Sequence, residues 1–413
     1  MTSRFVMMLA ALAAGCLQPT SDRCADGRTC SGGTTCDMTN GLCVPPIQAE
    51  ACLGHIDGNA CRFAGEYGVC NVGTCVPTIW TPTVLDTASG GPGQPSGLAL
   101  DRMGVVYLAD RLGHRLVRMD PSGVVTTVAG TGTACAQPTT ACGDGGLATA
   151  AQLDAPAGVA VDSRGNVYIS DTGDNRIRII DTGGIIATIA GTGTFDSGGD
   201  GGATSAAQLR NPTGLYLDEA SHVLYAADTG NHVIRAIDLA TAMIHTVAGR
   251  PAVLGFFGDG HEASKALLYQ PQAITKCANG DLFIADTGNN RVRRVEAGTN
   301  MISTAIGDGS VSSAGDGSPA SIFPVDAPLG LACDAIGNVY VTSKTSVREV
   351  AADERGVIDG SGLAVTIYGK PPRDTFPASV TVCLTGLALS DAKNVEVIDA
   401  CSGLLVHLQR GPT

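Results

Sequence analysis

The sequence predicts an all-β fold, a six-bladed β-propeller. Glycine is abundant, with 55 residues of 413, only 16% of the residues are charged, and short Val/Ile/Leu/Tyr segments alternate with Gly, Asp and Asn clusters. This pattern is typical of many short strands joined by turns. A similar segment recurs six times at spacings of 56–61 residues, and each copy holds about four short strands. Four antiparallel strands per repeat, six times over, predict a propeller.

Each repeat begins with Pro-x-[Gly/Ala]-[Leu/Val/Ile] and an apolar first strand, although the sixth has lost its proline. The starts are Pro95, Pro156, Pro212, Pro271, Pro328 and Leu384. In the first four repeats the second strand ends at an aspartate, namely Asp110, Asp171, Asp228 or Asp286. A turn such as 286–291 (DTGNNR) and a third strand follow, and the fourth strand contains a Thr-Val-Ala-Gly motif or a variant.

The residue pattern of these repeats resembles that of the NHL family. Residues 165–176 (GNVYISDTGDNR) and 143–146 (GDGG), followed by Gln152-Leu153, carry the resemblance. It covers residues from about 83 to 410, is strong in blades one to four and is weaker afterwards. Blade five has Val341–Lys344 in place of the Asp-Thr-Gly turn, and blade six has Glu396 in place of the usual aromatic residue. The resemblance implies an NHL propeller over residues 81–413.

The last repeat lacks a fourth strand, because the chain ends soon after a third strand at Leu404–Leu408. An extended segment before blade one, Thr83–Leu85, is expected to supply the missing outer strand of blade six. Such a joint would remove an exposed sheet edge and close the ring.

The N-terminus has the layout of a signal peptide, with a short positive start, an apolar run at Phe5–Ala14, and Gly15-Cys16. The run is too short for a membrane span. Residues 12–16 (LAAGC) resemble the bacterial lipobox, which implies a signal peptide over 1–15, acylation of Cys16 and a lipidated tether over 16–23. Acyl chains would anchor the chain in the lipid bilayer. Residue 17 is Leu rather than Asp, so the expected location is the outer membrane or surface of a bacterial envelope. Ordinary secretion with a coincidental cysteine is the alternative.

Residues 24–77 form a cysteine-rich segment of two similar units with four cysteines each. The cysteines are Cys24, Cys30, Cys36 and Cys43 in the first unit, and Cys52, Cys61, Cys70 and Cys75 in the second. Units this small cannot bury a sufficient core, so disulfides are expected, with connectivity left open. A zinc site is weaker, because no Cys-x-x-Cys pair is present and only His55 lies nearby. The segment suits a stiff stalk or, less well, a recognition module.

The remaining cysteines suggest disulfides within the propeller. Cys135 and Cys142 lie seven residues apart in one loop and are expected to pair. Cys383 and Cys401 fall on the same rim of blade six and are expected to pair as well. Cys277 and Cys333 end neighbouring inner strands, so a bond between blades is a further option.

The innermost strands are almost wholly apolar and contain no His, Asp or Glu. Enzymes with related propellers, such as peptide-amidating lyases and gluconolactonases, hold a metal in the central channel with such ligands. We therefore expect any site to come from the loops. The seven histidines do not fall at neighbouring positions, so a shared zinc is not expected and the metal, if any, is unknown.

One rim collects the aspartates of the turns after strand two and of the Gly-Asp-Gly loops between blades. These candidate ligand-binding residues are Asp144, Asp200, Asp259, Asp316, Asp171, Asp228 and Asp286. Such loops could ligate Ca²⁺. The favoured alternative is structural, because Asp in a turn usually accepts hydrogen bonds from its own backbone. The repeated pairs Asp110/Arg115, Asp171/Arg176 and Asp286/Arg291 likewise suit ties within each blade.

The net charge of −13, with no Lys/Arg run, argues against a nucleic-acid partner. The sequence therefore predicts a membrane-tethered extracytoplasmic scaffold whose propeller rim binds a protein or a glycan. A lyase or hydrolase that uses a metal held by rim loops is the alternative, and a purely structural envelope protein is a third hypothesis.

Overall fold

The computed structural model describes the propeller in residues 94–136, 142–311, 318–353, 356–362, 364–369, 384–391, 394–400 and 404–410. Before residue 94 it describes the backbone of six short strands only. The chain divides into two compact units, residues 1–78 together with 413, and residues 79–412. In the described part of the chain no helix has the length and apolarity that crossing a bilayer requires.

The N-terminal unit contains short antiparallel strands. Strand β1 (Thr35–Cys36) pairs with β2 (Cys43–Val44), and β3 (Ala60–Phe63), β4 (Glu66–Asn71) and β5 (Thr74–Pro77) form a three-stranded sheet. The expected acylation of Cys16 and the expected disulfides of Cys24, Cys30, Cys36, Cys43, Cys52, Cys61, Cys70 and Cys75 lie outside the residues whose side chains are described.

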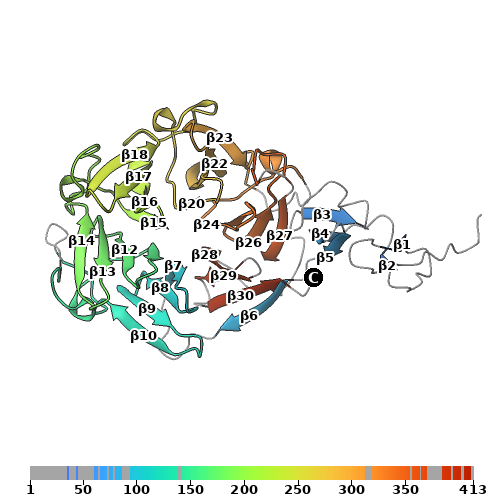
Figure 1. The fold of residues 1–413 in the computed structure, drawn as a ribbon. Helices are drawn as coiled ribbons and strands as arrows, with labels where there is room; N and C mark the ends of the chain where they lie inside the picture. The colour runs from blue at the N-terminus through green and yellow to red at the C-terminus, as the bar shows by residue number, and fades with distance from the viewer. Residues whose placement is uncertain are drawn as a thin grey trace, which may run out of the picture. The chain divides into compact units, whose positions relative to one another are not determined.

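The second unit confirms the six predicted blades, arranged in a ring (Figure 1). Blade one contains β7 (Pro95–Leu100), β8 (Val106–Asp110), β9 (Arg115–Met119) and β10 (Val125–Ala129). Blade two contains β11 (Val159–Val161), β12 (Val167–Asp171), β13 (Arg176–Ile180) and β14 (Ile186–Ala190). Blade three contains β15 (Pro212–Asp218), β16 (Val223–Asp228), β17 (Val233–Asp238) and β18 (Met243–Ala248).

Blades four to six keep the same order, although the repeat signal is weaker in blades five and six. Blade four contains β20 (Ala273–Lys276), β21 (Leu282–Asp286), β22 (Arg291–Val295) and β23 (Met301–Ile306). Blade five contains β24 (Gly330–Cys333), β25 (Val339–Thr342), β26 (Ser346–Val350) and β27 (Ala364–Gly369). Blade six contains β28 (Leu384–Asp391), β29 (Asn394–Asp399), β30 (Leu404–Arg410) and a fourth strand from the start of the unit.

That fourth strand is β6 (Trp80–Leu85), which pairs antiparallel with β30 and places Leu85 opposite Leu405 and Thr83 opposite His407. The predicted closure of the ring is therefore confirmed, and the closing strand begins at Trp80, three residues before the predicted start. In Figure 1 the blue β6 lies beside the red β30. The pairing covers the edge that β30 would otherwise expose.

The glycine of the repeat start permits close approach between inner strands. A Cβ on Gly158 would lie 2.1 Å from the carbonyl oxygen of Thr213 in the next blade, and a Cβ on Gly97 would lie 2.1 Å from that of Ala157. No side chain fits such a gap, so the inner strands of neighbouring blades could not pack this tightly without glycine. The recurring Pro-x-Gly motif thus has a packing cause.

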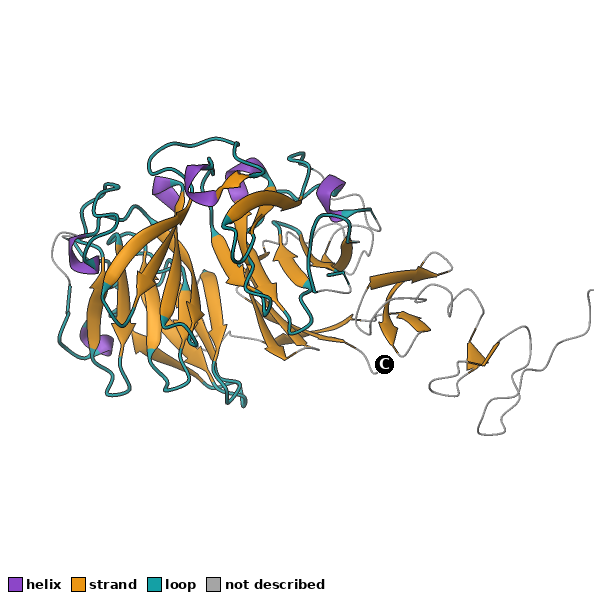
Figure 2. Ribbon diagram, turned by 45° about the horizontal axis from the view of Figure 1, so that its top comes forward, coloured by secondary structure: helices purple, strands orange, loops and turns teal. Residues whose placement is uncertain are grey.

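Short 3₁₀ helices lie in the loops and turns rather than within the blade strands (Figure 2). Helices η1 (Ala148–Ala150), η2 (Thr204–Ala206), η4 (Ala263–Lys265) and η6 (Ala320–Ile322) lie in the links between blades, and η3 (Thr229–Asn231) and η5 (Thr287–Asn289) lie in turns after strand two. In blade four the link also forms β19 (His261–Glu262), which pairs with β23. Each such link covers the outer strand of the blade that it enters, a feature the sequence did not predict.

Two disulfides join described cysteines. Cys135 bonds to Cys142 within one loop, as the spacing predicted. Cys277 bonds to Cys333 and joins the ends of the inner strands of blades four and five, which settles an option the sequence left open. The expected pair Cys383–Cys401 lies outside the described residues.

Candidate functional site

The third strands of blades two to five each carry a fully buried arginine. These residues are Arg178, Arg235, Arg293 and Arg348. They hold equivalent places in the ladders, because Arg178 lies opposite Ile169, and Arg293 lies opposite Ile284. A buried guanidinium requires anionic partners or carbonyl oxygens. These arginines therefore determine which contacts the rim aspartates make.

Arg178 and Arg293 each bind two of the predicted rim aspartates. Nη1 of Arg178 lies 3.2 Å from Asp171 and Nη2 lies 2.5 Å from Asp144. The corresponding distances from Arg293 are 3.4 Å to Asp286 and 2.7 Å to Asp259. One aspartate of each pair ends a second strand, and the other belongs to the Gly-Asp-Gly loop, so the arginine fastens the loop to the blade.

The described loop aspartates also bind the outer strand of the same blade, Asp144 and Asp259 through their second carboxylate oxygen. Oδ2 of Asp144 accepts from the backbone N–H of Thr188 at 3.0 Å, and Oδ2 of Asp259 accepts from the hydroxyl of Thr304 at 2.7 Å. Asp200 accepts from Thr246 at 2.9 Å and lies 3.5 Å from Nη2 of Arg235. These contacts supply the structural role that the sequence offered as the alternative to Ca²⁺.

The described residues contain no group of three or more His, Cys, Asp or Glu side chains arranged to hold a metal ion. Asp316, the fourth loop aspartate, lies outside the described residues.

The aspartates that end the second strands are fully buried. Asp171, Asp228 and Asp286 each accept from a backbone N–H of the preceding link, at 2.7, 2.8 and 2.7 Å. Burial raises the pKa of Asp228 to about 6, against the opposing effects of hydrogen bonds from Asn231 and Arg210. Burial and the nearby Asp174 carboxyl raise the pKa of Asp171 in the same way. All three serve as buried anchors of the links.

The expected ties between aspartate and arginine need a correction. Asp110 and Arg115 form the predicted pair at 3.0 Å. The ion pairs of Asp171 and Asp286 are with Arg178 and Arg293, two residues beyond the arginines that the sequence suggested, Arg176 and Arg291. Side chains two residues apart share one face of a strand, so the longer reach along that face is available. Arg291 extends to the carbonyl oxygen of Asp308, and Arg176 to that of Thr192.

Two of the scattered histidines have structural contacts that explain their spacing. His114 and His232 have positive φ angles of 47° and 60° in the turns after strand two. Their Nδ1 atoms accept from the backbone N–H of Ala155 and Gln270 in the next links, at 3.1 and 3.2 Å. Asn175 and Asn290 have the same contacts in blades two and four. The turn residue therefore ties one blade to the next.

The lining of the central channel is mostly apolar, as the apolar inner strands predicted. Its described lining encloses about 90 Å³ and consists of Gly, Ala, Val, Leu and Ile, together with Thr213 and Gln272. No His, Asp or Glu belongs to this lining, so the described channel does not contain the metal ligands of the related enzymes named above.

Exposed apolar side chains lie on the loops that enter blades three and four. They are Phe195, Val253, Leu254, Phe256 and Phe257. The guanidinium of Arg210 stacks on Phe195 at 4.1 Å, and that of Arg291 stacks on Phe256 at 4.0 Å. We call residues 192–199 and 250–257 the aromatic loops.

The two aromatic loops meet at Asn231. Its side chain donates to the carbonyl oxygen of Asp196, and its own carbonyl oxygen accepts from the N–H of Ala252. Phe195 and Val253 each directly adjoin one of these contacts. The apolar side chains are thus borne by two loops that are fixed to the same turn.

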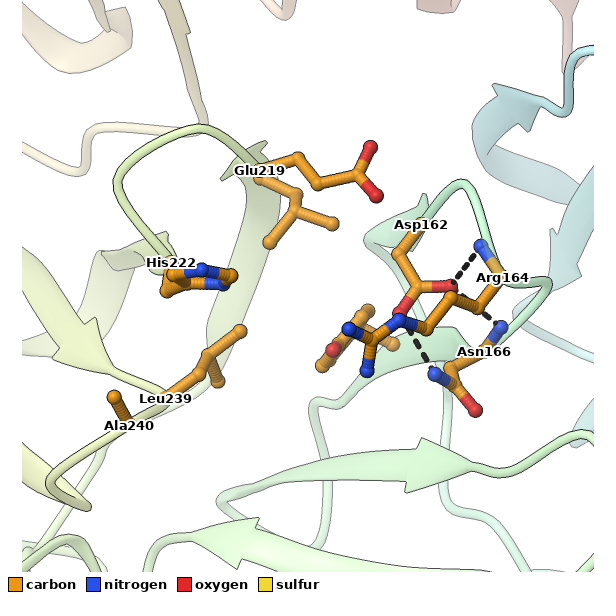
Figure 3. Close-up of a pocket in the computed structure, with 9 residues that line it drawn as sticks. Asp162, Arg164, Asn166, Glu219, His222, Leu239 and Ala240 are labelled. Carbon is orange, nitrogen blue, oxygen red and sulfur yellow. Dashed lines mark hydrogen bonds between the residues drawn. The ribbon is translucent and has the colours of Figure 1, made fainter.

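A pocket of about 300 Å³ lies on the opposite rim, between blades two and three (Figure 3). Its lining comprises Asp162, Arg164, Asn166, Tyr168, Leu217, Glu219, His222, Leu239 and Ala240. The sequence predicted no site on this rim. One available signal was the turn Glu219–His222, which departs from the Asp-x-x-Gly pattern of the turns at Asp101, Asp162 and Asp334.

Similarity to known proteins agrees with these repeats. Residues 118–198 match the family described as the Teneurin NHL domain. The fold is a six-bladed β-propeller, and this match supports NHL-type repeats within it. Over 291 residues it is 30% identical to Teneurin-4 of Mus musculus, a match that covers 63% of this chain and 10% of the relative. The chain therefore spans about a tenth of the length of this relative.

Solved structures share the fold at low identity. A gluconolactonase of Xanthomonas campestris is 14% identical, with a TM-score of 0.51 over 87% of this chain and 99% of that one. An auxiliary nutrient binding protein of Bacteroides thetaiotaomicron is 12% identical, with a TM-score of 0.53 over 89% and 85%. One is an enzyme and the other a binding protein, so the shared fold does not choose between these functions.

Proposed function

We propose that this chain is an extracytoplasmic scaffold, anchored by acylated Cys16 to a bacterial envelope membrane at the outer membrane or cell surface, that binds a protein through its aromatic loops. The observation that carries this proposal is the group of exposed Phe, Leu and Val side chains on residues 253–257, together with Phe195. Phe257 is 55% exposed and Leu254 is 57% exposed. Large apolar side chains held out on fixed loops are typical of interaction surfaces.

The chemistry of the aromatic loops favours a protein partner over a glycan. Aromatic residues and arginine are enriched at the energetic centres of protein interfaces, and both occur here as stacked Phe195/Arg210 and Phe256/Arg291 pairs. Leu254 and Val253 add aliphatic surface, which cannot form hydrogen bonds with the hydroxyl groups of a sugar. Loops fixed at Asn231 also lose little conformational entropy on binding.

The test compares two double variants of the full chain. Leu254→Ser/Phe257→Ser removes exposed apolar surface from the aromatic loops. Met103→Ser/Val124→Ser is the matched control, because both residues are highly exposed and lie in turns of the opposite rim. Photo-crosslinking residues at positions 257 and 103 report contacts in the native envelope.

We expect position 257 to crosslink a defined protein, the aromatic-loop variant to lose its affinity for that protein by at least about tenfold, and the control to keep it. Equal crosslinking from both positions, or unchanged affinity, would overturn the proposal. Binding on a glycan array that only the aromatic-loop variant loses would replace the protein partner by a glycan.

The anchor has its own test. The Cys16→Ser variant should leave the membrane fraction for the soluble fraction of the envelope, because a protein without its acyl chains loses most of its membrane affinity. Retention of this variant on membranes would overturn the anchor and leave the binding surface unaffected.

A further inference from the structure

The pocket between blades two and three is built from three turns that converge on one rim. Residues 162–166 follow β11, residues 219–222 follow β15, and Leu239-Ala240 follow β17. The pocket volume of about 300 Å³ is at the lower end of the range for small-molecule sites. It lies on the rim opposite the aromatic loops, so it is independent of the function proposed above.

Both carboxylates of this pocket are already satisfied. Oδ1 of Asp162 accepts from the N–H groups of Arg164 and Asn166 at 3.0 and 2.8 Å, and Oδ2 accepts from the Asn166 amide at 2.7 Å. Glu219 accepts from the N–H of Ser163 at 3.0 Å and from the hydroxyl of Ser163. Its other oxygen lies 3.5 Å from Nη2 of Arg102. A cation would have to displace these contacts.

The groups without described partners are hydrogen-bond donors. Tyr168 is only 5% exposed, and its hydroxyl has no hydrogen-bond partner in the described structure. Arg164 and His222 are exposed residues, and their guanidinium and imidazole groups form no ion pair or hydrogen bond among the described residues. Figure 3 shows them on opposite sides of the space, Arg164 from blade two and His222 from blade three. These donors open onto the pocket, so they are available to an acceptor group of an occupant.

The remaining wall is apolar. Leu217 and Leu239 line the pocket together with Ala240. An occupant must therefore present an acceptor group to Arg164 and Tyr168 and an apolar body to the leucines. The fixed carboxylates of Asp162 and Glu219 disfavour a dianion more strongly than a monoanion, because repulsion grows with charge.

We propose that this pocket binds a small organic monocarboxylate. Arg164 receives the carboxylate, in the planar geometry that a guanidinium offers. The Tyr168 hydroxyl donates to the same group, and Leu217 and Leu239 pack against the hydrocarbon part. His222 closes the side formed by blade three.

Calorimetric titration of the full chain with benzoate, phenylacetate and hexanoate tests the proposal. Benzamide serves as the neutral analogue of benzoate, and inorganic phosphate, titrated at about pH 8 where it is mainly doubly charged, serves as the dianion. At least one carboxylate should bind in the millimolar range or tighter, and benzamide and phosphate should bind at least about tenfold more weakly.

The variants Arg164→Gln and Tyr168→Phe should each weaken carboxylate binding by about tenfold or more while the near-ultraviolet circular dichroism stays unchanged. Arg118→Gln is the matched control, since Arg118 is an exposed arginine of blade one outside the pocket, and it should bind normally. The proposal is overturned if no carboxylate binds in the millimolar range, if benzamide or phosphate binds as well as benzoate, or if the pocket variants behave like the control.

Discussion

Nη2 of Arg293 on β22 lies 2.7 Å from the carboxylate of Asp259, a residue of the loop that enters blade four. The same guanidinium reaches Asp286 at the end of β21. Blade two repeats this arrangement with Arg178, Asp144 and Asp171. The buried arginine of the third strand thereby fastens the loop that enters the blade to the end of the second strand. We call this arrangement of one arginine and two aspartates the brace. This brace gives the Gly-Asp-Gly loops at Asp144 and Asp259 a structural role.

Replacement of Arg293 by alanine should lower the free energy of unfolding by about 3–5 kcal/mol, because it leaves the carboxylate of Asp286 buried without its charge partner. Urea denaturation followed by circular dichroism measures the change. Lys265→Ala is the control, since Lys265 pairs with Glu262 at 2.7 Å on the exposed surface. It should cost no more than about 1 kcal/mol. Similar losses for both variants would contradict the brace.

The raised pKa of Asp228 predicts that the stability of the protein depends on pH. Burial raises its pKa to about 6 in the folded state, above the ordinary value of 3.8. Between about pH 4 and pH 6 the folded protein therefore holds a proton that the unfolded chain has lost, so this residue makes stability fall as pH rises through that window. Below pH 4 both states are protonated and the penalty vanishes. At neutral pH the penalty reaches about 3 kcal/mol.

The Asp228→Asn variant tests this dependence by urea denaturation at several pH values from 4 to 7.5. Its unfolding free energy should decline less steeply with pH than that of the unmodified protein. Asp238→Asn is the control. Asp238 is half-buried, and its hydrogen bonds with Thr241 and Ala240 lower its pKa, so its contribution is lost only as pH falls. Parallel curves for the Asp228 variant and the unmodified protein would contradict the prediction.

The parts of this fold that were predictable are periodic or local. The spacing of the Pro-x-Gly starts indicates six blades, the missing fourth strand after Leu404–Leu408 indicates closure by the N-terminal segment, and the close spacing of Cys135 and Cys142 indicates a disulfide. The roles of Arg178 and Arg293 were not predictable, because Asp171 and Asp286 each have two arginines on one face of the facing strand. Only packing decides which of the two forms the ion pair.

The pocket between blades two and three was missed for a related reason. Its residues come from turns of different blades, such as Ser163 and Glu219, which make contact although they lie 56 positions apart. Repeat analysis aligns equivalent positions and says little about contacts between non-equivalent ones. The unpaired state of Tyr168, Arg164 and His222 depends on the folded structure alone.

The two described disulfides should differ in their contribution to stability. Cys277–Cys333 spans 56 residues and Cys135–Cys142 spans 7. Since a longer loop costs more entropy to close in the unfolded chain, replacing both cysteines by alanine should cost about 4 kcal/mol for the first pair and about 2 kcal/mol for the second. Thermal and urea unfolding of the two double variants measure these losses. The reverse order would show that Cys277–Cys333 does not restrain blades four and five.

The closure of the ring by β6 can be tested at two neighbouring positions of this strand, Thr83 and Val84. Pro82 lies opposite Leu408 and has no N–H, and an edge strand accepts proline where the N–H would point away from its partner. Because N–H directions alternate along a strand, the N–H of Thr83 should point toward β30 and that of Val84 away from it.

Thr83→Pro should therefore remove a hydrogen bond between β6 and β30 and lower the free energy of unfolding by about 1–3 kcal/mol. Val84→Pro is the matched control and should cost less, since its N–H faces solvent. Calorimetric melting curves and light scattering measure stability and self-association, because an opened edge invites pairing between chains. If the two variants melt at the same temperature as the unmodified protein, the pairing of β6 with β30 does not hold the ring closed.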